Sequence, residues 1–323
     1  MMTKKTILVV IPCLNEAAHI GRLLQQFCQI ESVLIVVADG GSTDGTQKIV
    51  KNFIIDNINI RLIHNNKKIQ SAGVNLAVKL FGNDSEYFIR IDAHADYPDN
   101  FITSLIQSAE MTHADSVVVA MDTVGKTDLQ KVFAVTQNSK LGNGGSAHRN
   151  IKNEGLWVDH GHHALMRVSA FNQVDGYDET FVANEDAELD FRLVKSGFKI
   201  WLTSATQMTY YPRGTFTGLF KQYYKYGIGR ASNVIKHKSI PKVRQLIPLS
   251  VLPALLLCLL YPVSLIYTLP FISWLIICLA YGVFLSIKNR KLIIILSGPS
   301  AAVMHLGWSA GFCRKLFSNT LFR

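Results

Sequence analysis

The last 133 residues of this 323-residue chain contain no aspartate or glutamate. All 23 acidic residues lie within residues 1–190, against 16 lysines and arginines, so that part has a net charge of −7. Residues 191–323 hold 17 lysines and arginines, which gives a net charge of +17. A basic segment of this length indicates an anionic partner, either nucleic acid or the surface of a membrane.

Charged side chains are absent from residues 246–287, a run of 42 residues. One membrane span needs about 20 apolar residues, so this run is long enough for two. Pro270 near its middle predicts a hairpin with arms at 246–268 and 271–287. The alternative, a buried hairpin in the core of a soluble protein, is disfavoured by this length. We therefore predict that the anionic partner is membrane lipid and that the protein binds no nucleic acid.

Basic clusters flank the apolar runs and predict their orientation. One covers residues 236–244, a second covers 288–291, and a third consists of Arg314 and Lys315. The positive-inside rule places the first two clusters in the cytoplasm, as a hairpin requires. Another apolar run at 292–312 is then either a third span or a re-entrant or interfacial segment. A third full span would place Arg314 and Lys315 on the outer side. We predict attachment to the inner (cytoplasmic) membrane, with the amino-terminal part of the chain facing the cytoplasm.

Cysteine is scarce, and its spacing disfavours two kinds of site. The five cysteines are scattered through the chain without a CxxC pair. This pattern is typical of reduced thiols and predicts neither a disulfide framework nor a zinc centre. The apolar stretch after Lys4 and Lys5 is too short for a signal peptide, which also favours a cytoplasmic amino-terminal part.

Four short apolar runs rich in β-branched residues predict the strands of a sheet. They cover residues 6–11, 33–38, 60–64 and 87–91, and a helical pattern follows each of the first three. Strands that alternate with helices predict an α/β fold with a parallel sheet. Because ligands of such sheets bind beyond the carboxyl ends of the strands, the polar residues found there are candidates for one site.

Polar residues follow the first two strands. Asn15 and Glu16 end the segment IPCLNE (11–16), whereas Asp39 and Asp44 belong to ADGGSTDGT (38–46). The glycines allow a ligand to approach the backbone closely, and Asp39 can accept hydrogen bonds from a base or a ribose. Neither the dinucleotide pattern GxGxxG nor the phosphate loop GxxxxGK[ST] is present.

The fourth strand runs into Asp92, His94 and Asp96. Asp92 and His94 can both bind one divalent cation, with Asp96 as a further ligand, and such a cation would neutralise a diphosphate leaving group. The imidazole suits Mn²⁺ better than Mg²⁺. The alternative is a polar turn in which a carboxylate caps the backbone.

Taken in order, these three segments resemble family 2 glycosyltransferases of the GT-A fold. Residues 161–193 resemble the acceptor-side block of that family, which contains the acidic pair Glu185–Asp186. QYYKY (222–226) resembles its QxxRW box, with Lys225 in place of arginine. The nearest likeness is to the succinoglycan-biosynthesis glycosyltransferases of the ExoA type, over about residues 7–230.

The resemblance implies a cytoplasmic glycosyltransferase domain at residues 1–235, an interfacial helix region at about 214–235 and membrane helices at 246–312. It implies a UDP-sugar donor, with UDP-glucose as the first choice, and Mn²⁺ or Mg²⁺ on Asp92, His94 and Asp96. The acceptor is expected to be a polyprenyl-diphosphate-linked saccharide. The donor would contact Pro12, Asn15, Glu16, Asp39, Asp44, Gln222 and Lys225. For Gln222 and Lys225 the alternative is an interfacial amphipathic helix without a binding role.

An inverting transfer needs a base that is ionised at neutral pH. Asp186 is the expected base and Glu185 its structural or acceptor-binding partner, because both begin a helical pattern whose dipole favours ionised carboxylates. The alternative is that both acids only stabilise the helix start. Glu188 and Asp190 are expected at the surface, and DHGHH (159–163) lacks the spacing of a zinc site. The glycine-rich run 141–149 is either an acceptor loop or a plain connection.

Three other functions compete with this one. A polyprenyl-phosphate sugar synthase would use the lipid phosphate itself as acceptor. A sugar nucleotidyltransferase would need a basic GxGTR-like loop after the first strand, where this chain has the acidic IPCLNE. A non-catalytic membrane scaffold with a degenerate site is suggested by His94, which stands where the family usually has a second aspartate.

Overall fold

The computed structural model describes residues 6–144, 154–181, 183–241 and 243–320. Two compact units are distinguished, and each is considered separately. The first unit comprises Met1–Asp122, Asn150–Thr180 and Glu185–Tyr210, and the second comprises Thr123–Arg149, Phe181–Asn184 and Tyr211–Arg323. Most of the glycine-rich run 141–149 lies outside the described residues.

The four predicted strands of the first unit are present, with small changes at their ends. They are β1 (Thr6–Cys13), β2 (Val33–Asp39), β3 (Ile60–His64) and β4 (Ser85–Arg90). The first three are followed by α1 (Ile20–Phe27), α2 (Thr46–Asp56) and α3 (Gln70–Phe81). In α1 the buried residues Ile20, Leu23, Leu24 and Phe27 recur at helical spacing, so the helix forms by burying one face.

An antiparallel strand separates the parallel strands of the sheet. The later elements are α4 (Phe101–Thr112), β5 (Ser116–Thr123), β6 (Leu156–Val158), β7 (His162–Arg167), α7 (Val168–Gln173), α8 (Glu185–Lys195) and β8 (Ile200–Tyr210). The strand order is β3-β2-β1-β4-β7-β5-β8-β6. β1, β2, β3 and β4 pair in parallel, whereas β7 is antiparallel to β4 and β5. The predicted α/β class is confirmed, and β7 starts beside the carboxyl end of β4.

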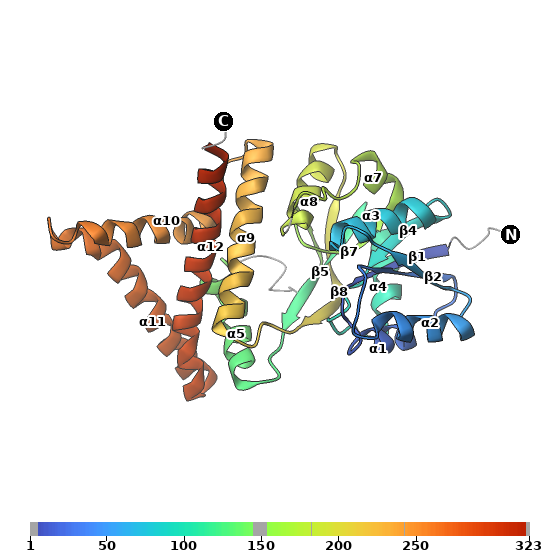
Figure 1. Cartoon of the computed structure of the whole chain (residues 1–323), viewed down its shortest axis with the longest axis horizontal. Coiled ribbons are helices and arrows are strands. Elements are labelled where there is room, and N and C mark those ends of the chain that lie inside the picture. Colours follow the sequence, from blue (N-terminus) through green and yellow to red (C-terminus); the bar gives the residue numbers. More distant parts are fainter. Residues whose placement is uncertain (1–5, 145–153, 182, 242, 321–323) are drawn as a thin grey trace. The chain divides into compact units, whose positions relative to one another are not determined.

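Both faces of the sheet are covered by helices, as a parallel sheet requires. Val9 and Ile11 of β1 pack in one cluster with α1, α2 and α4, whereas Leu8 and Val10 pack in another with α3, α7 and α8. Figure 1 shows α1 and α2 on one side of the strands and α3, α7 and α8 on the other. The carboxyl ends of the strands are therefore the place left for a ligand.

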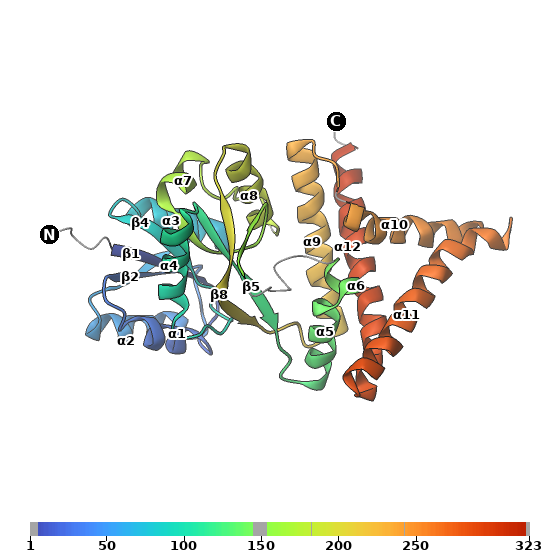
Figure 2. The same cartoon turned by 180° about the vertical axis from the view of Figure 1, so that it is seen from behind.

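The second unit is helical. Its helices are α5 (Asp128–Asn138), α6 (Lys140–Asn143), α9 (Phe216–His237), α10 (Val243–Leu257), α11 (Leu269–Asn289) and α12 (Ser297–Thr320). Turns of 3₁₀ helix cover Cys258–Leu260, Leu265–Thr268 and Leu292–Leu296. Figures 1 and 2 both show α9 and α12 side by side along their length. The core of this unit contains Phe133, Leu219, Leu285 and Met304, one residue from each of four helices.

The apolar hairpin differs from its predicted arms. α10 ends at Leu257, so residues 246–268 do not form one helix, and this prediction is wrong. Pro248 and Pro253 lie inside α10 and each removes a backbone donor, and Pro262 lies in the turn that follows. At about 1.5 Å per residue, the 15 residues of α10 extend about 22 Å, less than the roughly 30 Å of a hydrocarbon core.

Two later segments are long and apolar enough to cross a membrane. By length and composition these are Leu265–Asn289 and Leu292–Ser318, so the run predicted at 292–312 extends into a long helix. Along α11 the side chains of Ile277 and Ile287 are 59% and 73% exposed. Exposed apolar surface of this kind is typical of regions that bind a protein or a membrane.

Glycines allow α9 and α12 to approach closely. A Cβ atom at Gly311 would lie 2.0 Å from the carbonyl oxygen of Tyr224, and one at Gly227 would lie 2.0 Å from that of Trp308. Gly307, one turn before Gly311, faces the backbone of Phe220 in the same way. Small residues at such spacing are typical of tightly packed membrane helices.

We expect the Gly311→Ala substitution to destabilise the second unit. The added methyl group meets backbone rather than a side chain that can rotate, so the helices must separate, at a cost of about 1–3 kcal/mol. Thermal unfolding in detergent, followed by the helical circular dichroism signal, measures the change. Gly214→Ala is the matched control, because a Cβ atom there has no neighbour within 4 Å. Equal melting temperatures for the two variants would contradict the close approach.

Candidate active site

Hydrogen bonds lock together the loops that follow β1 and β2. The backbone N–H of Asn15 donates to Ser42 Oγ at 2.8 Å, and that of Ala17 donates to Asp44 Oδ2 at 2.9 Å. Asn15 has a φ of 57°, a left-handed conformation that asparagine tolerates. Pro12 lies buried at the end of β1. The structure thus brings the predicted nucleotide-binding residues of the two loops together.

Asp39 organises the second of these loops. Its side chain is buried, and Oδ2 accepts hydrogen bonds from the N–H groups of Gly41 and Ser42 and from Gln47 Nε2, at 2.9, 3.0 and 2.8 Å. Burial raises the pKa of Asp39, but a hydrogen bond from the Ser42 hydroxyl to Oδ1, together with the three donors to Oδ2, outweighs burial and holds the pKa below the usual value. Asp39 is therefore ionised, and its hydrogen bonds hold the loop after β2 (residues 40–45) in place.

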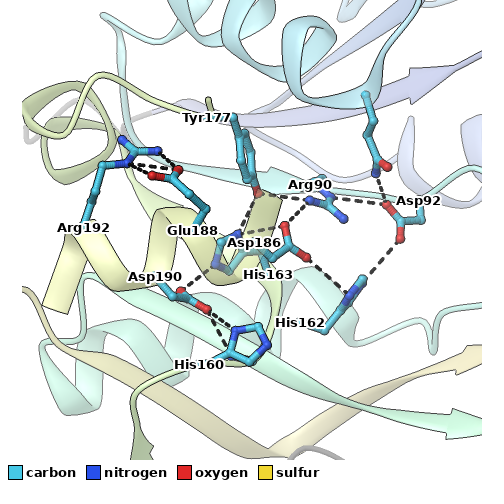
Figure 3. Close-up of polar contacts among 12 residues, drawn as sticks. Arg90, Asp92, His160, His162, His163, Tyr177, Asp186, Glu188, Asp190 and Arg192 are labelled. Carbon is cyan, nitrogen blue, oxygen red and sulfur yellow. Dashed lines mark hydrogen bonds and ion pairs between the residues drawn. The ribbon is translucent and has the colours of Figure 1, made fainter. Parts of the chain in front are cut away.

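Asp92 uses its two oxygens differently. Oδ1 accepts from Gln70 Nε2 at 2.6 Å and from Arg90 Nε at 3.3 Å, whereas Oδ2 faces His162 Nε2 at 3.4 Å (Figure 3). Burial raises the pKa of Asp92, but the charge of Arg90 and a hydrogen bond from His162 hold it well below its usual range. Asp92 is ionised, with one oxygen directed into the site.

The other two predicted metal ligands have separate partners. His94 is half exposed, and its Nδ1 lies 3.4 Å from Glu16 Oε1. Asp96 forms an ion pair with Arg22, and its backbone pairs with that of Thr209. No group of three or more histidine, cysteine, aspartate or glutamate side chains is arranged around a metal position in the part of the chain that the structure describes.

Asp92 nevertheless has the chemistry of a ligand for a cation on a diphosphate. Mg²⁺ at such sites is held by one or two carboxylates together with phosphate oxygens, rather than by a complete set of protein ligands. Asp92 Oδ2 is not engaged by Arg90 or Gln70, and the carboxylate is ionised. Asp92 therefore fits a divalent cation that binds together with the diphosphate of a nucleotide.

Arg90 joins Asp92 to Asp186. Its side chain is only 4% exposed, and Nη1 lies 2.6 Å from Asp186 Oδ1 and 3.0 Å from Tyr177 Oη. Arg90 therefore binds Oδ1 of both aspartates. Both Oδ2 atoms face the imidazole of His162, since its Nε2 is 3.4 Å from Asp92 and its Nδ1 is 3.8 Å from Asp186 (Figure 3).

The pKa values of the two acids at the start of α8 shift in opposite directions. Burial raises the pKa of Asp186, but the charges of Arg90 and His163 hold it well below its usual range. Burial raises the pKa of Glu185, and the neighbouring negative charge of Asp186 raises it further. Asp186 is therefore the ionised acid of the pair, and Glu185 is shifted towards its neutral form.

Glu188 and Asp190 are fully buried, so the prediction that they are surface acids is wrong. Glu188 pairs with Arg192, at 2.6 Å from Nη2 to Oε2. Asp190 lies 2.7 Å from both His160 Nδ1 and His163 Nε2. These acids are buried because each has a basic partner, which periodicity in the sequence does not reveal.

Gln222 and Lys225 lie on α9 in the second unit. Gln222 Nε2 donates to Tyr226 Oη at 3.0 Å, one turn along the helix, and the side chain of Lys225 is exposed. α9 covers most of the segment predicted as interfacial at 214–235.

Sequence reasoning missed Arg90, His162 and His163, although two signals pointed to this cluster. Arg90 is a lone charge in the apolar run before Asp92, and a charge in a buried strand needs a partner. Asp186 and Asp190 are four residues apart and so share one face of a helix. The histidines follow no rule of spacing, because only the pairing of β7 with β4 brings them to Asp92.

Comparisons with protein families place these motifs among glycosyltransferases. The family model described as glycosyl transferase family 2 matches residues 8–175, and that of glycosyl transferase family group 2 matches residues 108–287. The chain is 49% identical over 318 residues to the succinoglycan biosynthesis protein ExoA of Rhizobium meliloti (strain 1021), covering 98% of this chain and 96% of that protein.

A second relative is more distant. A dolichyl N-acetyl-α-D-glucosaminyl phosphate 3-β-D-2,3-diacetamido-2,3-dideoxy-β-D-glucuronosyltransferase of Methanococcus voltae is 24% identical over 244 residues, which cover 71% of this chain and 74% of that protein.

Solved structures of low sequence identity share the fold. The mannosyltransferase PcManGT from Pyrobaculum calidifontis, in complex with GDP-Man and Mn²⁺, matches with a TM-score of 0.63 and 16% identity, covering 98% of this chain and 88% of that one. Residues 1–349 of S. aureus TarS in complex with UDP match with a TM-score of 0.52 and 14% identity, covering 98% and 92%. The predicted GT-A fold is confirmed.

Proposed function

Because this chain belongs to glycosyl transferase family 2, we propose that it transfers a sugar from a nucleotide-diphosphate donor to a lipid-linked saccharide, with inversion at the anomeric carbon. The identity of 49% to a succinoglycan biosynthesis protein supports a role in exopolysaccharide synthesis. Glucose from UDP-glucose is the first donor to test.

The arrangement of Asp92 and Asp186 around Arg90 carries this proposal. Arg90 binds Oδ1 of both carboxylates, and their Oδ2 atoms face opposite nitrogens of one imidazole. An ionised base and an ionised ligand for the diphosphate cation are thus held close together. An in-line transfer needs this arrangement, because the attacking hydroxyl and the leaving diphosphate lie on opposite sides of one carbon.

In the reaction, Asp186 Oδ2 accepts the proton of the acceptor hydroxyl. The acceptor oxygen forms a bond to the anomeric carbon as the bond from that carbon to the diphosphate breaks, and the electron pair leaves with the nucleoside diphosphate. The configuration of the anomeric carbon is thereby inverted. A divalent cation, when bound, supplies the positive charge that neutralises the departing diphosphate. Asp92 would hold that cation, with His94 or Asp96 available after rotation of their side chains.

The donor nucleoside would lie against the two interlocked loops of the first unit, with Pro12, Asn15 and Glu16 on one and Asp39 and Asp44 on the other. PcManGT with GDP-Man and Mn²⁺, and TarS with UDP, support a nucleotide-sugar and a divalent cation as ligands of this fold.

The acceptor is proposed to be a saccharide on a polyprenyl diphosphate at the cytoplasmic face of the inner membrane. The relative that acts on a dolichyl-linked amino sugar supports a lipid-linked saccharide over a bare lipid phosphate. Leu265–Asn289 and Leu292–Ser318 would anchor the chain, and Gln222 and Lys225 on α9 would contact the diphosphate of donor or acceptor.

UDP release from a panel of UDP-sugars, measured with membranes that contain the protein, tests the proposal. We expect release with one sugar in the presence of Mn²⁺ and loss of release in EDTA. Release should be about 10²-fold slower in the Asp92→Asn variant, because even the hydrogen-bonding partners of metal ligands contribute about 10- to 100-fold. Asp84→Asn, at the opposite end of β4, is the matched control because Asp84 is exposed. Release of the transferred sugar as a free monosaccharide by mild acid would instead indicate a polyprenyl-phosphate sugar, because the new sugar–sugar bond of the proposed product survives that treatment.

If no donor gives UDP release, two explanations remain, and calorimetry distinguishes them. Mn²⁺-dependent binding of UDP would mean that the lipid acceptor is missing from the membranes. Absence of any binding would support the scaffold and contradict the proposed function.

A further inference from the structure

A buried histidine–aspartate pair lies behind Asp186. The side chain of His163 on β7 is 1% exposed, that of Asp190 on α8 is 0% exposed, and Nε2 lies 2.7 Å from Oδ1. Asp190 Oδ2 accepts a hydrogen bond from Gly161 N–H at 3.2 Å and lies 2.7 Å from His160 Nδ1 (Figure 3). Both oxygens of Asp190 are engaged, so the ring of His163 is held in one orientation.

The other nitrogen of His163 faces Asp186. Nδ1 lies 3.2 Å from Asp186 Oδ1 and 2.7 Å from Tyr177 Oη. Because Arg90 Nη1 contacts the same Oδ1 at 2.6 Å, that oxygen is held from two sides. Asp186 Oδ2 faces His162 Nδ1 at 3.8 Å, which is beyond the range of a hydrogen bond. His163 and Arg90 together therefore orient the carboxylate and leave Oδ2 for a substrate.

The charges of this cluster are consistent with a cationic His163. Burial lowers the pKa of His163, but the negative charges of Asp190 and Asp186 and a hydrogen bond to Asp186 hold it well above its usual value. Burial raises the pKa of Tyr177 to about 12, so its hydroxyl stays protonated. The charged or titratable groups around Asp186 are Arg90 from β4, Asp92 from the loop after it, His162 and His163 from β7, Tyr177, and Glu185 from α8.

We propose that His163 and Asp190 are positioning residues for the sugar transfer: Asp190 holds the His163 ring, and His163 holds Asp186 Oδ1 so that Oδ2 receives the proton of the acceptor. This role rests on the proposed function of Asp186 as the base. The proton moves only from the acceptor hydroxyl to Asp186, and His163 and Asp190 exchange none. Their contribution is orientation and positive charge next to the base.

Two substitutions separate this role from a merely structural one. His163→Asn keeps an N–H donor near the position of Nδ1 and removes the positive charge, whereas Asp190→Asn removes the partner of the ring. The shorter amide has no second nitrogen for Asp190, so its orientation towards Asp186 is no longer fixed. We expect kcat to fall on the order of 10²-fold in His163→Asn, as for a misplaced catalytic group, with an unchanged KM for the donor. The acid limb of the kcat–pH profile should move to higher pH by about one unit or more, because a nearby positive charge that lowers the pKa of Asp186 is lost.

The double variant tests whether Asp190 acts through His163. If it does, His163→Asn combined with Asp190→Asn loses no more activity than His163→Asn alone. Glu188→Gln is the matched control, since Glu188 is an equally buried acid of α8 whose partner is Arg192. The acid limb of the kcat–pH profile of Glu188→Gln should stay at the wild-type pH. Additive losses, or an acid limb that moves in none of the variants, would overturn the proposal.

If the variants do not fold, a measurement on the wild-type protein still tests the proposal. ¹⁵N NMR of histidine-labelled protein in detergent distinguishes a cationic from a neutral imidazole, and a histidine that remains cationic at pH 7 to 8 is expected for His163. Neutral resonances for every buried histidine at pH 7 would overturn the proposal. Because this readout needs no substrate, it separates failure of the positioning role from failure of the proposed function.

Discussion

The Asp186→Asn variant is expected to lose about 10³-fold in kcat for sugar transfer, within the range measured for general bases. The amide cannot accept the acceptor's proton, yet its oxygen can still accept a hydrogen bond from Arg90 Nη1, which lies 2.6 Å from Oδ1 in the wild type. Binding of the donor should therefore remain. Steady-state kinetics of UDP release, together with calorimetry of UDP binding, measure both quantities.

Two further variants show whether the effect belongs to Asp186. Asp56→Asn makes the same chemical change at an exposed position of α2 and should leave kcat unchanged. Glu185→Gln should cost less than Asp186→Asn, because burial and the charge of Asp186 already raise the pKa of Glu185 towards the neutral form. A larger loss in Glu185→Gln would assign the role of base to Glu185.

The Arg90→Met variant is expected to lower the free energy of unfolding at pH 7 by about 3–5 kcal/mol, the cost of breaking a buried ion pair from one side. Arg90 is 4% exposed and is the nearest positive charge to both Asp92 and Asp186, at 3.3 and 2.6 Å. Methionine fills much of the volume but leaves Asp92 without its arginine and Asp186 with only the charge of His163, which it shares with Asp190. Urea unfolding of the detergent-solubilised protein, followed by near-ultraviolet circular dichroism, gives the difference.

The loss of stability in Arg90→Met should depend on pH. In the wild type the pKa of Asp186 is lowered, chiefly because the charge of Arg90 outweighs burial, so the stability this group contributes is present above its unfolded-state pKa and is lost at lower pH. Without Arg90 the folded-state pKa rises, and keeping Asp186 ionised at pH 7 becomes costly. The difference in unfolding free energy between wild type and variant should therefore narrow as the pH falls through the raised pKa that Asp186 has in the variant.

Arg167→Met is the control for this prediction. Arg167 also pairs with two acids of the same unit, Glu86 at 2.6 Å and Asp115 at 3.4 Å, but its side chain is 25% exposed. Water can replace the lost partner there, so the cost should stay near the roughly 1 kcal/mol of a partly exposed pair. An equal cost for both arginines would show that burial does not decide the effect.

The first four strands, the helices after the first three, the loops at the ends of these strands and the acids that begin α8 were predictable from the sequence. β-Branched runs followed by helical spacing define β1, β2 and β3 with their helices, and β3 begins and ends at the predicted residues 60 and 64. The positions of Asp39 and Asp92 were predictable because each lies where an apolar strand run ends, Asp39 at the end of β2 and Asp92 after β4. Such features depend on residues close together in the chain, which is why pattern alone identifies them.

Contacts between residues distant in the chain decided the rest. β7 pairs with β4, with Ile89 opposite Leu165, and this pairing places His162 and His163 beside Asp92 and Asp186. Asp190 is charged and on a helix, so its sequence context predicts exposure, yet its partner His163 makes burial favourable. Composition likewise predicts a membrane hairpin, but prolines and tertiary packing set where its helices end. The sequence determined the first four strands and the chemistry available at their ends. Only the tertiary structure decided which side chains meet, because ion pairs and close helix contacts form between surfaces that sequence spacing does not relate.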